Sequence, residues 1–124
     1  MTTEEKLNII KESCQAKKGI DIKVLDIKDL SSIADYFVIV SGNSVTQVSA
    51  LADEIEEKME EQGISLENID GKNTSRWILL DYGDIIVHVF HKDERDYYNL
   101  ERLWSKEDEN EDKLKLKAQN EEEQ

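Results

Sequence analysis

Two histidines, His88 and His91, stand three residues apart in an apolar run typical of a β-strand. Side chains three positions apart on a strand point to opposite faces of the sheet, so a single metal ion could not readily be held by both. No cysteine lies near them in the sequence. We therefore expect His88 to lie on a sheet face and His91 to end the strand, without a metal site.

The segment 40–44, Val-Ser-Gly-Asn-Ser, joins a predicted strand to a predicted helix through a glycine turn. Free N–H groups at such a helix start can bind an anion. However, the sequence has neither the G-x-G-x-x-G pattern nor the P-loop pattern, and no lysine follows Gly42. A tight turn with Ser44 as N-cap accounts for these residues, and we favour it over a phosphate site.

Carboxylates and nucleophiles do not indicate catalysis either. The predicted strands lack the alternating D-x-D pattern that would place two acids on one face, and the closest pair, Asp81 and Asp84, straddles a turn. Ser41 and Ser44 lack a G-x-S-x-G setting, and Cys14 falls on the apolar stripe of a helix. The sequence predicts no active site, and we expect neither a cofactor nor a metal.

Composition restricts the partners and the compartment. The chain has 124 residues with 29 acidic and 16 basic side chains, a net charge of -13. This charge disfavours extensive binding to nucleic acid and favours a basic partner. No run approaches the ~18 apolar residues of a membrane span, and the first residues do not resemble a signal peptide. A lone cysteine fits a reducing, cytoplasmic compartment.

Three helices must position these side chains. Thr2 and Glu5 fit a capping box that starts the first helix, and Ser44 and Gln47 fit a second one, for a helix ending at Gly63. Asp93 is expected to cap a third helix that runs to Trp104. The stripes expected to be buried are Leu7, Ile10 and Cys14; Val45, Val48, Ala52, Ile55 and Met59; and Tyr97, Leu100, Leu103 and Trp104.

Strands are predicted at four places. Residues 20–27 alternate in polarity with a phase slip that suggests a bulge, and residues 36–40 form a continuous apolar run. Strands at 76–82 and 85–90 are joined by Gly83-Asp84, a two-residue hairpin signal. This order predicts the α/β class, a single domain with a mixed β-sheet and flanking helices.

Residues 105–124 differ in composition from the rest. They hold eight acids and four lysines, a net charge of -4 that leaves -9 for residues 1–104. Their apolar side chains, Leu114, Leu116 and Ala118, are too few to offset the entropy of ordering the segment. We expect a domain at 1–104 followed by a disordered acidic tail at 105–124.

The hairpin at 76–90 is apolar on both faces. Trp77 and Leu79 share one face of their strand with Asp81, and Ile78, Leu80 and Tyr82 share the other. Three helices would not readily cover both faces of such a sheet, which makes one face a candidate docking surface for a protein. Coverage of both faces by helices is the alternative.

Three spaced motifs cover much of the domain: S-S-I-A-D-Y-F-V-I-V-S-G-N-S at 31–44, W-I-L-L-D-Y-G-D-I-I-V-H-V-F at 77–90, and R-x-x-Y-x-L-E-x-L-W at 95–104. Together they resemble the ribosomal silencing factor family, also called Iojap-like proteins. The resemblance covers residues 1–104 and excludes the tail. It implies a nucleotidyltransferase-like topology without the enzyme activity of that fold.

The resemblance also implies a function. Family members bind the large ribosomal subunit through large-subunit protein fourteen, on the surface that meets the small subunit, and so block subunit joining and repress translation when nutrients are short. We accordingly expect little direct contact with ribosomal RNA and no membrane partner. Homodimerisation of the free chain through the same apolar face stays open.

The candidate contacts with the ribosomal protein come from the second and third motifs. They are Trp77, Leu79 and Tyr82 as apolar anchors, with His88, Phe90, Lys92, Arg95 and Tyr98 around them. On an ideal strand Tyr82 points away from the other two anchors, and it would reach the partner only over the sheet edge. Two alternatives are an adaptor that binds another protein through the hairpin and a degenerate nucleotidyltransferase that uses Asp81 or Asp84 with Mg²⁺.

Overall fold

The computed structural model describes residues 1–99, apart from the side chains of Tyr97 and Tyr98. The elements are α1 (Thr3–Ala16), β1 (Ile20–Asp26), β2 (Tyr36–Gly42), α2 (Val45–Glu61), β3 (Asn68–Asp70), β4 (Trp77–Asp81), β5 (Ile85–His91) and α3 (Lys92–Tyr98). The predictions for Leu100, Leu103, Trp104 and the tail 105–124 lie outside the described residues.

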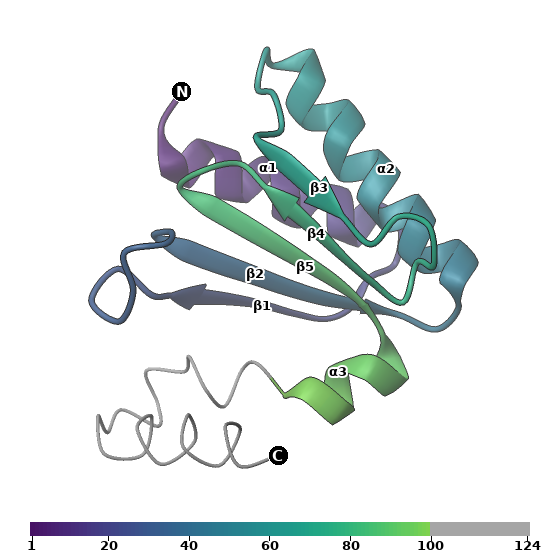
Figure 1. The fold of residues 1–124 in the computed structure, drawn as a ribbon. Coiled ribbons are helices and arrows are strands. Elements are labelled where there is room, and N and C mark those ends of the chain that lie inside the picture. Colours follow the sequence, from purple (N-terminus) through teal and green to yellow (C-terminus); the bar gives the residue numbers. More distant parts are fainter. Residues whose placement is uncertain (100–124) are drawn as a thin grey trace.

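The five strands form one mixed sheet in the order β1-β2-β5-β4-β3 (Figure 1). The central pair, β2 and β5, is parallel, and the other neighbours are antiparallel. The register of β1 shifts between Ile20 and Lys23, where Asp21 has a φ of 49°. The irregularity therefore lies earlier than the predicted slip after Val24, and the pairing from Lys23 to Asp26 is regular. The mixed α/β class is confirmed, whereas the short strand β3 was not predicted and the nucleotidyltransferase-like topology stays a prediction.

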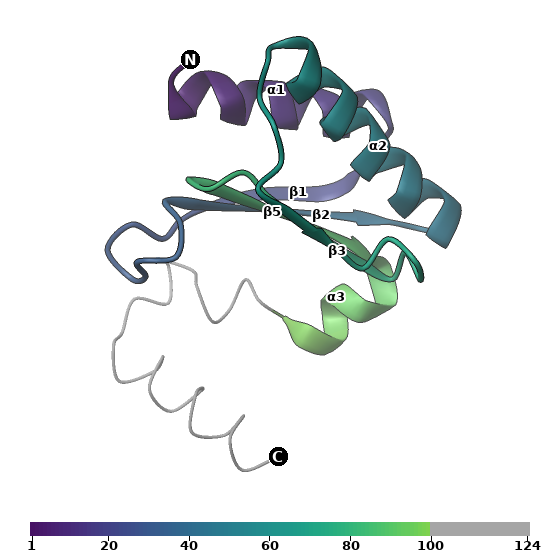
Figure 2. The same ribbon diagram turned by 45° about the horizontal axis from the view of Figure 1, so that its top comes forward.

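Helices α1 and α2 lie together on one face of the sheet, and α3 lies on the other side (Figure 2). The core between the sheet and the helix pair consists of Leu7, Ile10, Cys14, Val38, Val40, Val48, Leu51, Ala52, Ile55, Met59, Ile78, Leu80, Tyr82, Ile85, Val87 and Val89. Leu51 belongs to this stripe, whereas Val45 is 42% exposed and its predicted burial is wrong. At 3.6 residues per turn Val45 lies about 60° from the centre of the stripe.

The helix ends follow local sequence signals. Thr2 and Glu5 form the predicted reciprocal capping box. Ser44 caps α2 through the N–H of Gln47, whose own side chain accepts from Asn43 N and donates to the carbonyls of Lys17 and Lys18. The expected cap of α3 by Asp93 is wrong. His91 ends β5 in an extended conformation, and its Nδ1 accepts from Asp93 N.

The hairpin turn between β4 and β5 is fastened to the start of α1. Asp84 accepts hydrogen bonds from Thr3 Oγ1 at 2.7 Å and from Lys6 Nζ at 3.3 Å. Burial alone would raise the pKa of Asp84. The hydrogen bonds from Thr3 and Lys6 and the positive charge of Lys6 have the larger combined effect, so the pKa of Asp84 is lowered. The turn therefore positions the first helix over the sheet.

Replacing Asp84 with alanine is expected to lower the free energy of unfolding by about 1–2 kcal/mol, because Thr3 and Lys6 lose a partly buried carboxylate partner. Urea denaturation measures the change. Asp53→Ala is the matched control, because Asp53 pairs with Lys72 on the exposed surface and such pairs contribute about 0–1 kcal/mol. Equal losses in the two variants would contradict a fastening role for Asp84.

Candidate protein-docking surface

The sheet face away from α1 and α2 carries the hairpin residues that were predicted to share a side. Trp77 and Leu79 of β4 pair with Phe90 and His88 of β5. Phe90 and His88 are buried, whereas Trp77 and Leu79 are half-buried. We call this surface the hairpin face, and it consists of Leu25, Phe37, Trp77, Leu79, Ile86, His88 and Phe90.

The hairpin face continues across β2 to β1 and the loop that follows it. Phe37 and Ile86 are buried with Ile27 and Ala34, and the half-buried Leu25 and Leu79 pack against them. The loop also holds Ile33, which is 64% exposed. Sequence reasoning missed Leu25 as a part of this surface. For Leu25 the available signal was plain strand alternation: without a bulge after Val24, Leu25 lies on the opposite face from Val24 and pairs with Phe37.

Aromatic contacts fix the side chains of the hairpin face. The Trp77 indole Nε1–H donates to His88 Nδ1 at 3.1 Å, and the Trp77 ring stacks on Phe90 with 4.8 Å between centroids. Phe37 meets the His88 ring edge to face at 4.6 Å. Burial lowers the pKa of His88 to about 4, so the imidazole is neutral at pH 7. The half-buried indole is thus packed against the buried rings of Phe90 and His88.

Tyr82 lies on the opposite face from Trp77 and Leu79. Its side chain is only 5% exposed and packs in the core beneath the helix pair. The prediction that Tyr82 is an apolar anchor is therefore corrected: strand alternation directs it into the core, and it does not reach over the sheet edge. Burial raises the pKa of its hydroxyl above the ordinary value.

The predicted contacts on α3 lie in different environments. Arg95 is buried, and its Nη1 donates to Ser41 Oγ at 2.9 Å and to the carbonyl of Ile20 at 3.2 Å. Arg95 thereby joins α3 to β2 and to the bulge of β1. Lys92 is exposed at the start of α3, and the side chain of Tyr98 lies outside the described part of the chain. Of the two side chains that the structure describes here, Lys92 is exposed and Arg95 is buried, and a contact of Lys92 with a partner stays a prediction.

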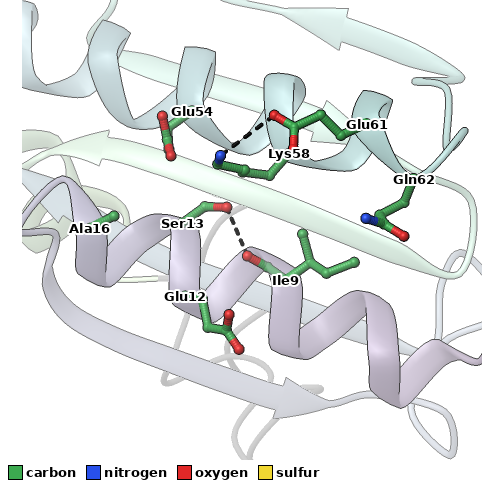
Figure 3. A pocket seen from close by; sticks show the side chains of 8 residues that line it. All are labelled: Ile9, Glu12, Ser13, Ala16, Glu54, Lys58, Glu61 and Gln62. Atoms are coloured by element: carbon green, nitrogen blue, oxygen red, sulfur yellow. Dashed lines mark hydrogen bonds and ion pairs between the residues drawn. The ribbon is translucent and has the colours of Figure 1, made fainter.

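A groove lies on the other side of the molecule, between α1 and α2 (Figure 3). It has a volume of about 350 Å³ and is lined by Ile9, Glu12, Ser13, Ala16, Glu54, Lys58, Glu61 and Gln62. Ser13 Oγ donates to the carbonyl of Ile9, and Lys58 pairs with Glu61 on the same helix (Figure 3). Both of these donors are therefore engaged within their own helices.

The remaining chemical candidates have structural roles. Asp81 accepts from Gly83 N in the hairpin turn, and Asp84 holds Thr3 and Lys6. Burial raises the pKa of the Cys14 thiol to about 12. Within residues 1–99, no group of three His, Cys, Asp or Glu side chains could hold a metal ion, and no helix is long and apolar enough to cross a membrane.

Comparison with known proteins identifies the family. A family model described as "Ribosomal silencing factor during starvation" matches residues 1–124. The chain belongs to the ribosomal silencing factor family. A relative named ribosomal silencing factor RsfS from Bacillus subtilis is 48% identical over 104 residues, which are 84% of this chain and 88% of the relative. The resemblance carried by the three sequence motifs is thus confirmed.

Solved structures show the same fold as this chain. A crystal structure of a Chromobacterium violaceum protein matches with a TM-score of 0.82 and 36% identity, over 84% of this chain and 87% of that one. A Bacillus halodurans crystal structure matches with a TM-score of 0.76 and 44% identity, over 83% and 96% of the two chains. The arrangement of the sheet and its helices is therefore shared by these proteins.

Proposed function

We propose that the protein binds the large ribosomal subunit through large-subunit protein fourteen, blocks joining of the small subunit and so represses translation under nutrient limitation. Membership in the ribosomal silencing factor family supports the process. The hairpin face supports the mode of binding, because its half-buried Trp77 packs on the buried rings of Phe90 and His88. Its half-buried Leu79 packs against the buried cluster that contains Phe37 and Ile86. Aromatic anchors of this kind dominate binding energy at protein interfaces.

Inhibition by this route requires only that the protein bind the large subunit tightly and at the surface where the small subunit joins. A domain bound where the two subunits meet excludes volume that the small subunit must occupy. An interface of standard size buries about 1,600 Å² in total, which is sufficient for tight binding when its anchors are well held. No substrate, cofactor or bond-breaking step is required of the protein.

The charge of the chain supports contact with protein over contact with RNA. Helix α2 alone carries six acids and one lysine. Such a surface is repelled by RNA phosphates and is attracted to a basic ribosomal protein, an attraction that speeds encounter more than it raises affinity. The hairpin face lies on the other side of the sheet from α2, and we assign to it the apolar contact with the ribosomal protein.

Sedimentation of the protein with purified ribosomal subunits tests this function. We expect the protein to migrate with the large subunit and to lower the fraction of joined ribosomes. Migration at the top of the gradient at all concentrations would contradict the proposal. Co-migration without any change in joining would indicate an adaptor that binds the ribosome elsewhere.

Deleting residues 105–124 is expected to change the dissociation constant for the large subunit by less than about threefold. The proposed contacts all lie in residues 1–104, and a tail with a charge of -4 mainly affects the rate of encounter. Equilibrium sedimentation of the full and shortened chains with large subunits measures the difference. A loss of tenfold or more would place the tail within the binding site.

A further inference from the structure

The indole of Trp77 has used its one hydrogen-bond donor inside the protein. An indole carries a single N–H and no acceptor, and this N–H lies 3.1 Å from His88 Nδ1. Because tryptophan can only donate, Nδ1 must accept, and the proton of the neutral imidazole is on Nε2. The pairing therefore specifies both the orientation of the indole and the tautomer of the histidine.

His88 is itself held firmly. It lies on the central strand β5, is 4% exposed, and sits against the Phe37 ring at 4.6 Å. In the antiparallel register His88 pairs with Leu79, so Trp77 is its diagonal neighbour on β4. Such diagonal neighbours lie within reach of long aromatic side chains. The strand pairing thus brings a fixed acceptor to the indole nitrogen.

From this geometry we propose that His88 is a positioning residue for Trp77, and that Trp77 meets the ribosomal protein through the face and edge of its ring alone. This inference rests on the proposed function. It assigns a chemistry to the partner, whose surface opposite Trp77 is an apolar patch rather than a hydrogen-bond acceptor. Holding the indole in one rotamer before binding reduces the side-chain entropy lost in the complex.

Four variants test the coupling through their dissociation constants for purified large subunits: Trp77→Phe, Trp77→Ala, His88→Phe and the double variant with both phenylalanines. Phenylalanine at 77 keeps a ring but loses the N–H and with it the bond to His88, and we expect a loss of about tenfold, below the loss of about 30-fold for alanine. Phenylalanine at 88 keeps the packing without the acceptor, and we expect a loss of about tenfold.

The double variant decides the mechanism. Once Trp77 is phenylalanine there is no N–H for His88 to hold, so His88→Phe should add less than about twofold. A full additional loss in that background would show that His88 acts by packing alone and would overturn its positioning role. A loss for Trp77→Phe as large as that for Trp77→Ala would overturn the contact through the ring alone.

A spectroscopic measurement follows the bond without the ribosome. In the Trp104→Phe background, the indole ¹H–¹⁵N signal belongs to Trp77, and we expect its hydrogen to exchange slowly with solvent. His88→Phe should make that exchange at least tenfold faster, and His88→Asn should restore slow exchange because its amide oxygen can stand where Nδ1 does. Fast exchange in the protein with His88 intact would contradict the inference.

The two measurements separate failure of the inference from failure of the proposed function. If neither Trp77→Ala nor any other variant weakens binding to large subunits, docking through the hairpin face is wrong, and ring contact with the partner is overturned with it. The exchange data would then still decide whether His88 holds the indole. If Trp77→Ala weakens binding while His88→Phe does not, the docking surface stands and the positioning role is overturned.

Discussion

Replacing Trp77 with alanine is expected to weaken binding to the large ribosomal subunit by about 30-fold, which corresponds to about 2 kcal/mol. Trp77 is half-buried on the hairpin face, and Phe90 and His88 hold its ring in place. Truncation removes both the apolar contact area and the pre-formed shape of the hairpin face. Equilibrium sedimentation with purified large subunits measures the loss.

The matched control for this prediction is Val45→Ala. Val45 is also a partly exposed apolar side chain, but it lies on α2, on the other side of the sheet. We expect it to change binding by less than twofold. Equal effects at positions 45 and 77 would contradict docking through the hairpin face.

Weaker binding by Trp77→Ala could reflect either a lost contact with the partner or unfolding of the domain, and the stability of the variant distinguishes the two. Trp77→Ala must still unfold cooperatively in urea for its weaker binding to report on the interface. Leu79→Glu provides a second variant on the hairpin face, because a half-buried leucine there can be replaced by a charge that an apolar partner surface would exclude. Normal binding by folded Leu79→Glu would place the docking surface elsewhere.

Lowering the pH from 7.5 to 5 is expected to remove about 2 kcal/mol of stability through His88 alone. Burial lowers the pKa of this imidazole from 6.5 to about 4 in the folded protein. Between these values the unfolded chain binds a proton that the folded chain does not, so stability falls as the pH drops through this window. Below pH 4 both states are protonated, and the contribution of His88 becomes constant.

Urea unfolding of the wild type and of His88→Phe at several pH values isolates this effect. The carboxylates that titrate in the same range are common to both proteins, so the difference between the two stability curves reports on His88. We expect the variant to lose less stability than the wild type between pH 7.5 and 5. Parallel curves for the two proteins would show that His88 is not held neutral in the folded state.

Local signals predicted much of the fold. The capping box at Thr2, the end of α2 at Gly63 and the Gly83-Asp84 turn each depend on a few neighbouring residues, and all three were predicted where the structure has them. Strand β3 escaped prediction because three residues are too few to show a periodic pattern. The cap by His91 was missed because serine, threonine, aspartate and asparagine are the usual N-caps.

The sequence by itself determined the family, through three spaced motifs, and the division of the hairpin side chains between two faces. That division follows from the period of two along a strand, which is a local property. It correctly separated Trp77 and Leu79 from Tyr82.

Only the tertiary structure decided which of those faces the helix pair α1 and α2 covers. Burial depends on how elements distant in the sequence pack, and α1 with α2 covers the face that contains Tyr82. On the hairpin face Trp77 stays half-buried, and His88 is buried against Trp77 and Phe37. Arg95 was predicted to contact the partner, but its guanidinium holds α3 to the sheet through Ser41 and Ile20. Both residues lie more than fifty positions away in the sequence, so no local pattern could have predicted these hydrogen bonds.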